Sequence, residues 1–529
     1  MAKDRGDTRT LLKRAGLVAS GTLASRVLGA VRDAVIAATF TLGATDVFWM
    51  AFTIPNALRV ILGEGAVGGA FIPVFTEVVE REGLDRAKTF YAKLTGAMLA
   101  ILAAVSALGV AFAPPIVLAY ASGFHRTPGL FEETVLLTRI VFPYIFFMGV
   151  AALMTGALNA RKHFAAPAFA PTLLNVAMIA SPWVFAPLAA KLGLPLSAAL
   201  ALAAMVGGVL QVAVQLPAMR AEGLLLRPTW DLGDVYVRKA FGLLVPLLLG
   251  LGVYQLNVAL SRQFTSFLPH GAMSYLYYGQ RLVEIPQGMF ALAVASAALP
   301  SISETIARGE TEDAKRIFRD SLKLTLLVAI PSSIALMALA EPCVAVLFGR
   351  GLFDAHAIAQ TGRSLFYQSA GIWAVASVRT VVPMFYGMND TRTPVVASAV
   401  NLLVFGGSAF ALLGPMSHAG IAAAISLASI AQLTALLVLL RKKAGRLGFS
   451  DVAKGAFRVF LASVVMGVVM SAVASVGRWH EGGNSLRNVG VLAAAGLGGI
   501  LAFVAAGKAL RMPELEILLA ALKRRLGRR

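Results

Sequence analysis

The stretch AMLAILAAVSALGVAFA, residues 97–113, decides the fold class, because it contains no charged side chain and a single hydroxyl group. Similar apolar runs occupy residues 173–190 and 489–506. Each run approaches the ~20 residues with which a helix crosses roughly 30 Å of hydrocarbon. Over the whole chain 58% of the residues are apolar and 14% are charged, whereas an average soluble domain is about half apolar and about a quarter charged. The sequence therefore predicts an all-α integral membrane protein, most of which is surrounded by lipid.

Hydropathy and turn signals extend this prediction to about fourteen transmembrane helices. The predicted spans are residues 15–40, 46–72, 92–113, 130–158, 166–190, 195–219, 238–265, 271–300, 320–340, 357–387, 393–413, 417–440, 455–476 and 487–508.

The charge distribution indicates how the chain is oriented. Lys and Arg number 47 against 27 Asp and Glu, a formal net charge of +20. Basic residues gather in alternate connections between spans, and the connections between them are short and poor in Lys and Arg. The basic stretches are 3–14, 81–93, 161–162, 220–239, 308–323, 441–458 and 508–529. By the positive-inside rule both termini are predicted to be cytoplasmic and the number of spans to be even. The predicted location of this helical membrane protein is the bacterial inner membrane.

Several function classes are excluded by what the sequence lacks. Nucleic-acid binding is not expected, because no basic groove with interleaved aromatic residues is present. The single cysteine, Cys343, excludes an internal disulfide, and the six histidines show no metal-ligand spacing. No catalytic or cofactor-binding motif appears. We therefore expect no enzyme activity, no metal and no cofactor, and a transport function driven by the membrane potential or an ion gradient.

An internal repeat defines the predicted organisation. Pro73 and Glu77 in PVFTEVVEREGLDRAK match Pro300 and Glu304 in PSISETIARGETEDAK, with a separation of 227 positions in both cases. The segments ALNARKHFAAP and GMNDTRTP repeat at a similar separation. Two six-helix lobes around a central cavity are a known transporter architecture. The predicted parts are an N-terminal lobe at 1–225, a C-terminal lobe at 226–445, and two further helices with a basic cytoplasmic tail at 446–529.

Charged residues inside the predicted spans mark the candidate site, because each costs several kcal/mol unless it faces protein or water. The set is Arg26, Arg32, Asp33, Asp46, Arg59, Glu64, Arg262, Arg281 and Glu284. Arginine suits bidentate binding of phosphate, so the set predicts a water-filled cationic cavity for a phosphate-bearing head group. The alternative is that pairs such as Arg281 and Glu284 only tie helices together.

The motifs around these charges resemble the MurJ/MviN family of lipid II flippases, within the MOP exporter superfamily. The resemblance rests on SRVLGAVRDAVIA (25–37), ATDVFWMAFTIPNALRVILGEGAVGGAFIPVF (44–75), YYGQRLVEIPQGMFALAVASAALP (277–300) and FYGMNDTRTP (385–394). It implies two six-helix lobes with two C-terminal helices bordering a groove for the polyprenyl tail. It further implies that lipid II, the undecaprenyl-pyrophosphate-linked peptidoglycan precursor, is carried from the cytoplasmic to the periplasmic leaflet by alternating access.

The same resemblance implies roles for individual residues. Arg26, Arg32, Arg59 and Arg281 correspond to required cavity arginines, and Asp33, Asp46, Glu64 and Glu284 to the acidic members of that cavity. Implied partners are lipid II and membrane lipids, with cell-wall synthesis proteins as further candidates.

One position departs from the family pattern. Some members carry an aspartate just before the seventh-helix arginine as part of a sodium site, whereas here Ser261 precedes Arg262, and the apparent eleventh-helix partner position is Phe405. A hard cation prefers carboxylate and carbonyl oxygens, so this alignment disfavours sodium coordination. Three alternatives to lipid II transport stay open: export of another polyprenyl-linked oligosaccharide, drug export, and a non-transporting scaffold.

Overall fold

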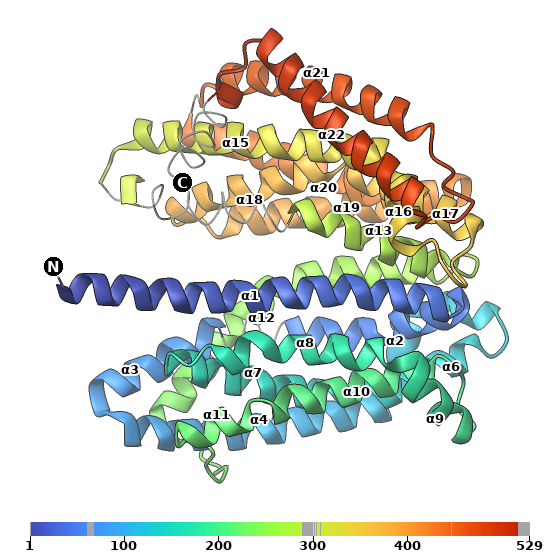
Figure 1. Ribbon diagram of the computed structural model, residues 1–529. Coiled ribbons are helices and arrows are strands. Elements are labelled where there is room, and N and C mark those ends of the chain that lie inside the picture. The colour runs from blue at the N-terminus through green and yellow to red at the C-terminus, as the bar shows by residue number, and fades with distance from the viewer. Residues whose placement is uncertain are drawn as a thin grey trace. The chain divides into compact units, whose positions relative to one another are not determined.

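The described residues form helices, which pack against one another within each of two compact units (Figure 1). A computed structural model describes the backbone of residues 2–60, 68–287, 300, 302, 304–306, 308–445 and 447–516, and the side chains of these ranges except 2–15 and 245–254. By internal contacts the chain divides into two compact units, Met1–His270 and Gly271–Arg529.

The N-terminal unit begins with the long helix α1. Its elements are α1 (Ala2–Thr39), α2 (Leu42–Val60), α3 (Ile72–Glu82), α4 (Leu84–Ala111), α5 (Ala113–Ala121), η2 (Ser122–Arg126), α6 (Leu130–Val141), α7 (Tyr144–Ala160), α8 (Ala165–Ile179), η3 (Ser181–Phe185), α9 (Ala186–Lys191), α10 (Ala198–Ala213), α11 (Leu216–Ala221) and α12 (Val235–Thr265).

The C-terminal unit begins with α13 and ends with a pair of long helices. Its elements are α13 (Ala272–Pro286), α15 (Thr311–Ala338), α16 (Ala340–Phe348), α17 (Ala355–Ser369), α18 (Ile372–Gly387), α19 (Arg392–Met416), α20 (His418–Ala444), α21 (Phe449–Ala474) and α22 (Leu486–Ala509).

An aromatic cluster packs the ends of α3, α4 and α7 together in the N-terminal unit. Phe71, Phe75 and Phe90 are almost fully buried, and their rings contact one another and Tyr91. Gly83 joins α3 to α4 with a φ of 84°, a positive value that glycine adopts without steric cost. The turn and the cluster together fix the direction in which α4 enters the unit.

In the C-terminal unit the main core lies among α15, α18, α20 and α21. Phe318 and Phe385 are fully buried there, and Leu436 and Leu440 of α20 complete the cluster. The helix α21 packs against both α15 and α22. Cys343 of α16 joins a smaller cluster with Met466 and Met470 as a partly buried apolar residue and a free thiol.

The helices overlap every predicted span. Among the described residues, eight helical segments are long and apolar enough to cross a membrane: Leu84–Ala111, Leu130–Ala160, Ala198–Ala221, Thr311–Ala338, Arg392–Met416, His418–Ala444, Phe449–Ala474 and Leu486–Ala509. The pair Ala165–Ile179 and Ser181–Lys191, bent by 48°, makes a ninth if it is one span. The all-α membrane class is confirmed, whereas the total of fourteen spans stays a prediction.

The contact-defined units and the predicted lobes divide the chain at different residues. The helix α12, which the repeat assigns to the second lobe, belongs to the N-terminal unit by its contacts. The lobe boundaries at 225 and 445 rest on sequence repetition and stay predictions.

Candidate functional site

Arg32 on α1 is held by the carboxylate that follows it in the sequence. Its Nε and Nη2 atoms donate to Oδ1 of Asp33 at 2.9 and 2.7 Å. The two side chains are only 12% and 4% exposed. A guanidinium so placed inside a membrane protein would cost several kcal/mol alone, and the two charge-assisted hydrogen bonds offset this cost.

A neutral residue of α8 binds the other terminal nitrogen of the same guanidinium. The side-chain oxygen of Asn175 accepts from Arg32 Nη1 at 3.1 Å, while its amide nitrogen donates to the backbone oxygen of Ser25 at 3.0 Å. Asn175 is 6% exposed, so these bonds form away from bulk water. Asn175 therefore joins α8 to α1 and positions the arginine.

The helix α2 also contributes residues to the polar surroundings of Arg32. The guanidinium of Arg32 lies 5.9 Å from the ring centroid of Trp49, a cation–π contact. Asp46, one turn earlier on α2, is buried at 4% exposure. One turn later, the Thr53 hydroxyl accepts from Nε of Arg262 on α12 at 3.2 Å. Residues from α1, α2, α8 and α12 thus meet in one buried polar region of the N-terminal unit.

The other predicted residues of this unit differ in burial, and one of them falls outside the described residues. Arg26 is exposed on α1. Arg59 is half-buried near the end of α2, where its Nε donates to Asn56 Oδ1 at 3.0 Å. Ser261 is half-buried on α12, and its backbone oxygen accepts from the Thr265 hydroxyl at 2.7 Å. Glu64 falls within residues 61–67, outside the described part of the chain.

In the C-terminal unit the two predicted charges of α13 pair with each other. Arg281 Nη1 donates to Glu284 Oε2 at 2.7 Å, with side chains 38% and 46% exposed. The guanidinium also lies 4.8 Å from the ring centroid of Tyr277, one turn earlier. Both contacts stay within one helix.

These ion pairs can be compared with the alternative in which the charged residues only hold helices together. The Arg32–Asp33 and Arg281–Glu284 ion pairs each join residues of a single helix. Each pair orients its guanidinium. Around Arg32 in the N-terminal unit, hydrogen bonds from arginines to the uncharged residues Asn175 and Thr53 join α1 to α8 and α12 to α2.

Sequence reasoning missed Asn175, although one signal for it was present. Asn175 lies inside the apolar run of residues 173–190, where a lone amide costs free energy unless it finds a hydrogen-bond partner. Asn175 was not predicted because only ionisable residues within the spans were considered as candidates.

Comparisons with known proteins agree with the fold and the motifs. A family model described as "Lipid II flippase MurJ" matches residues 36–481. The "Lipid II flippase MurJ" of Burkholderia cenocepacia is 35% identical over 468 residues, covering 87% of this chain and 89% of the relative. The "Probable lipid II flippase MurJ" of Haemophilus influenzae is 34% identical over 478 residues, covering 87% and 92%.

Two solved structures share the fold. One, described as "Lipid II flippase MurJ, inward closed conformation", aligns with a TM-score of 0.75 at 22% identity, covering 93% of this chain and 98% of the other. The other, an inward-facing MATE-family multidrug resistance transporter of the MOP superfamily, aligns with a TM-score of 0.64 at 14% identity, covering 81% and 96%. At these identities the likeness supports the architecture.

Proposed function

The chain belongs to the MurJ family of lipid II flippases, and we propose that it moves lipid II across the membrane by binding the pyrophosphate with its intramembrane arginines. It is a multi-pass membrane transporter and not an enzyme. Export of drugs or of another polyprenyl-linked oligosaccharide has no comparable support among the relatives.

The proposed mechanism rests on the burial and the hydrogen bonds of Arg32. It is a guanidinium inside a membrane protein, 12% exposed, with its orientation set by Asp33 and Asn175. These contacts keep a positive charge at a defined place inside the membrane protein, and arginine is the side chain best suited to binding phosphate. Arg26, Arg59 and Arg281 are proposed as further phosphate ligands, used as the head group passes from one side to the other by alternating access.

Asp33, Asp46, Glu64 and Glu284 are proposed to balance the arginines when no substrate is bound. Without such carboxylates, unpaired guanidinium groups would be costly in a medium of low dielectric constant. Asp33 and Glu284 are already paired with arginines in this structure.

The family and the charge distribution together support a membrane location and an orientation. We place the protein in the bacterial inner membrane, as membership of the MurJ family implies. We place both termini in the cytoplasm, because basic residues gather in alternate connections. Cell-wall synthesis proteins are proposed partners on chemical grounds, since they consume the transported precursor.

The proposal assigns no sodium site to α12. Ser261 offers one hydroxyl where a carboxylate would be needed. Phe405 of α19, at 3% exposure, supplies no oxygen from its side chain. Coupling to protons or to the membrane potential is therefore the proposed energy source.

The proposal is tested by complementation of a strain depleted of its own lipid II flippase. We expect Arg26→Ala and Arg281→Ala to abolish growth at unchanged protein levels in the membrane. Arg308→Ala is the matched control, because Arg308 is 61% exposed and pairs with Glu304 one turn away. Normal growth of both cavity variants would remove the arginine mechanism.

Reconstitution separates the substrate alternatives. Proteoliposomes that contain lipid II and a leaflet-specific probe should show movement of lipid II between leaflets. A teichoic-acid or O-antigen precursor on the same polyprenyl carrier should move much more slowly. Equal rates for both substrates would favour a general exporter of polyprenyl-linked oligosaccharides.

A further inference from the structure

The connection between α11 and α12 presents large apolar side chains on its surface. We call residues 222–234 the connector. Leu225 is 56% exposed, Trp230 59% and Leu232 45%, while Leu224 is the one buried leucine of the connector and lies in the cluster with Phe75 and Phe90. A water-exposed loop rarely carries several exposed large apolar residues together, so these side chains indicate contact with an apolar phase or a partner.

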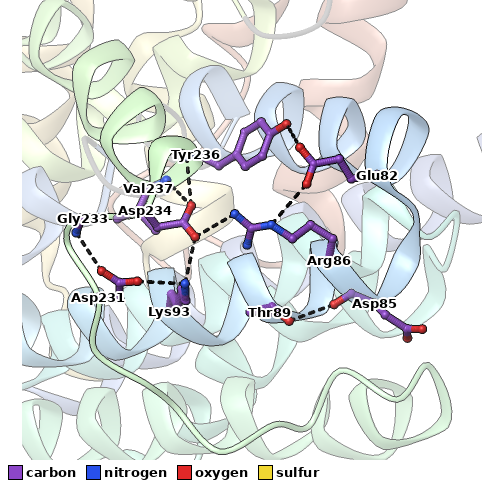
Figure 2. Close-up of polar contacts among 10 residues, drawn as sticks. All are labelled: Glu82, Asp85, Arg86, Thr89, Lys93, Asp231, Gly233, Asp234, Tyr236 and Val237. Atoms are coloured by element: carbon purple, nitrogen blue, oxygen red, sulfur yellow. Dashed lines mark hydrogen bonds and ion pairs between the residues drawn. The ribbon is translucent and has the colours of Figure 1, made fainter.

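A polar cluster holds the connector in one conformation (Figure 2). The Asp234 carboxylate, 2% exposed, accepts from Arg86 Nη2 at 2.8 Å and from Lys93 Nζ at 3.0 Å. Its other oxygen accepts from the backbone amide of Tyr236 at 3.0 Å and so caps the start of α12. Lys93 also donates to Asp231 at 2.8 Å. The exposed apolar side chains are therefore displayed by a fixed loop.

The contact between the connector and α4 indicates how close the connector lies to the predicted membrane span. The backbone amide of Thr229 donates to the oxygen of Ala92 at 3.1 Å. One turn further along α4, a Cβ on Gly96 would lie 2.0 Å from the Thr229 oxygen, so the absence of a side chain there is what lets the connector approach. Residues 92 and 96 lie at the start of the predicted span 92–113. The predicted span therefore puts Trp230, the neighbour of Thr229, at the membrane surface.

Basic side chains accompany the apolar ones. Arg220 at the end of α11 and Arg227 in the connector are both exposed. Tryptophan favours the boundary between hydrocarbon and head groups, where its apolar ring and its N–H group both find suitable surroundings. Arginine at the same level is attracted to anionic lipid phosphates.

We propose that the connector is a membrane-interface anchor, which inserts Trp230 and Leu225 among lipid head groups and binds the phosphate of an anionic phospholipid through Arg220 and Arg227. The polar cluster transmits this anchoring to the first turn of α12, because Asp234 both caps that helix and binds α4. This inference concerns the resting protein in a bilayer and does not depend on which substrate is transported.

The test uses a fluorescent bimane label at position 230 in the full-length protein. Cys343→Ala removes the natural thiol, and Trp230→Cys introduces the labelling site. The matched control is Asp85→Cys, because Asp85 is fully exposed on α4 and lies about 10 Å further from the span than Ala92. Each protein is reconstituted in phosphatidylcholine vesicles containing a fixed fraction of brominated phosphatidylcholine or brominated phosphatidylglycerol, whose acyl chains quench only labels within the bilayer.

We expect strong quenching at position 230 and little at position 85. Brominated phosphatidylglycerol should quench position 230 more than brominated phosphatidylcholine at equal fraction. Arg227→Ala should reduce that preference roughly fivefold, since each basic side chain near an anionic surface contributes about that factor. Gly96→Ala, which displaces Thr229, should weaken quenching at position 230 by either lipid.

Two results would overturn the inference. If position 230 is no more quenched than position 85, the connector lies in water and its apolar face belongs to a protein partner. If the two brominated lipids quench position 230 equally, and Arg227→Ala changes nothing, the arginines do not bind anionic lipid.

Discussion

Replacing Asp234 tests whether the polar cluster of Figure 2 stabilises the protein. Asp234→Ala removes a helix cap, worth about 1 kcal/mol, and two charge-assisted hydrogen bonds, each worth about 1.5–3 kcal/mol. Arg86 and Lys93 are 29% and 22% exposed and keep Glu82 and Asp231 as partners. Water and these partners recover part of the loss, so we expect the free energy of unfolding to fall by about 2–4 kcal/mol.

Asp234→Asn separates the two contributions. An asparagine oxygen still accepts from the backbone amide of Tyr236, so the cap survives. The amide nitrogen replaces the oxygen that accepts from Arg86 and Lys93, so the charge and both charge-assisted hydrogen bonds are lost. We expect a loss of about 1–3 kcal/mol, always smaller than that of the alanine variant.

The assay is equilibrium unfolding in mixed dodecylmaltoside and dodecyl sulfate micelles, followed by far-ultraviolet circular dichroism. Asp85→Ala is the control, because its carboxylate is fully exposed and its nearest partner, Lys88 Nζ, is 3.7 Å away; the expected change is below about 0.5 kcal/mol. If Asp234→Ala costs no more than Asp85→Ala, the cluster does not stabilise the fold and the reasoning is wrong.

Three further predictions concern packing, coupling and pH. Gly109→Ala should destabilise the protein by about 1–3 kcal/mol in the micelle assay, because the new Cβ would lie 1.8 Å from the Phe142 ring, whereas Gly43→Ala, with nothing within 4 Å, should be neutral; equal effects would contradict the packing. Ser261→Ala should leave complementation unchanged, and a strong growth defect would place coupling at this residue. Burial acts to raise the pKa of Asp234, but hydrogen bonds from Lys93 and Arg86 outweigh it and leave the pKa below its usual range. The cluster's stabilisation should therefore be complete above about pH 5 and decline below about pH 4; Asp234→Asn should flatten this decline in the micelle assay, and an unchanged pH profile would count against it.

The sequence was sufficient for the class of protein and the approximate place of its helices. Apolar runs such as residues 97–113 must satisfy their backbone hydrogen bonds internally in lipid, which leaves the helix as the conformation for an isolated span. The same physics makes charged residues in such spans conspicuous, so Arg32 and Arg281 stand out as candidates from the sequence alone. The motifs around them resemble the family that the comparisons confirm.

The partners of those residues were beyond the sequence. Asn175 is 143 positions from Arg32, and Asp234 is 148 positions from Arg86. Hydropathy and helical periodicity report only on neighbours along the chain, within a few turns. They show that a side chain is costly in its surroundings, but not which distant group offsets the cost. Only the packing of α1 on α8, and of the connector on α4, brought these atoms within hydrogen-bonding distance.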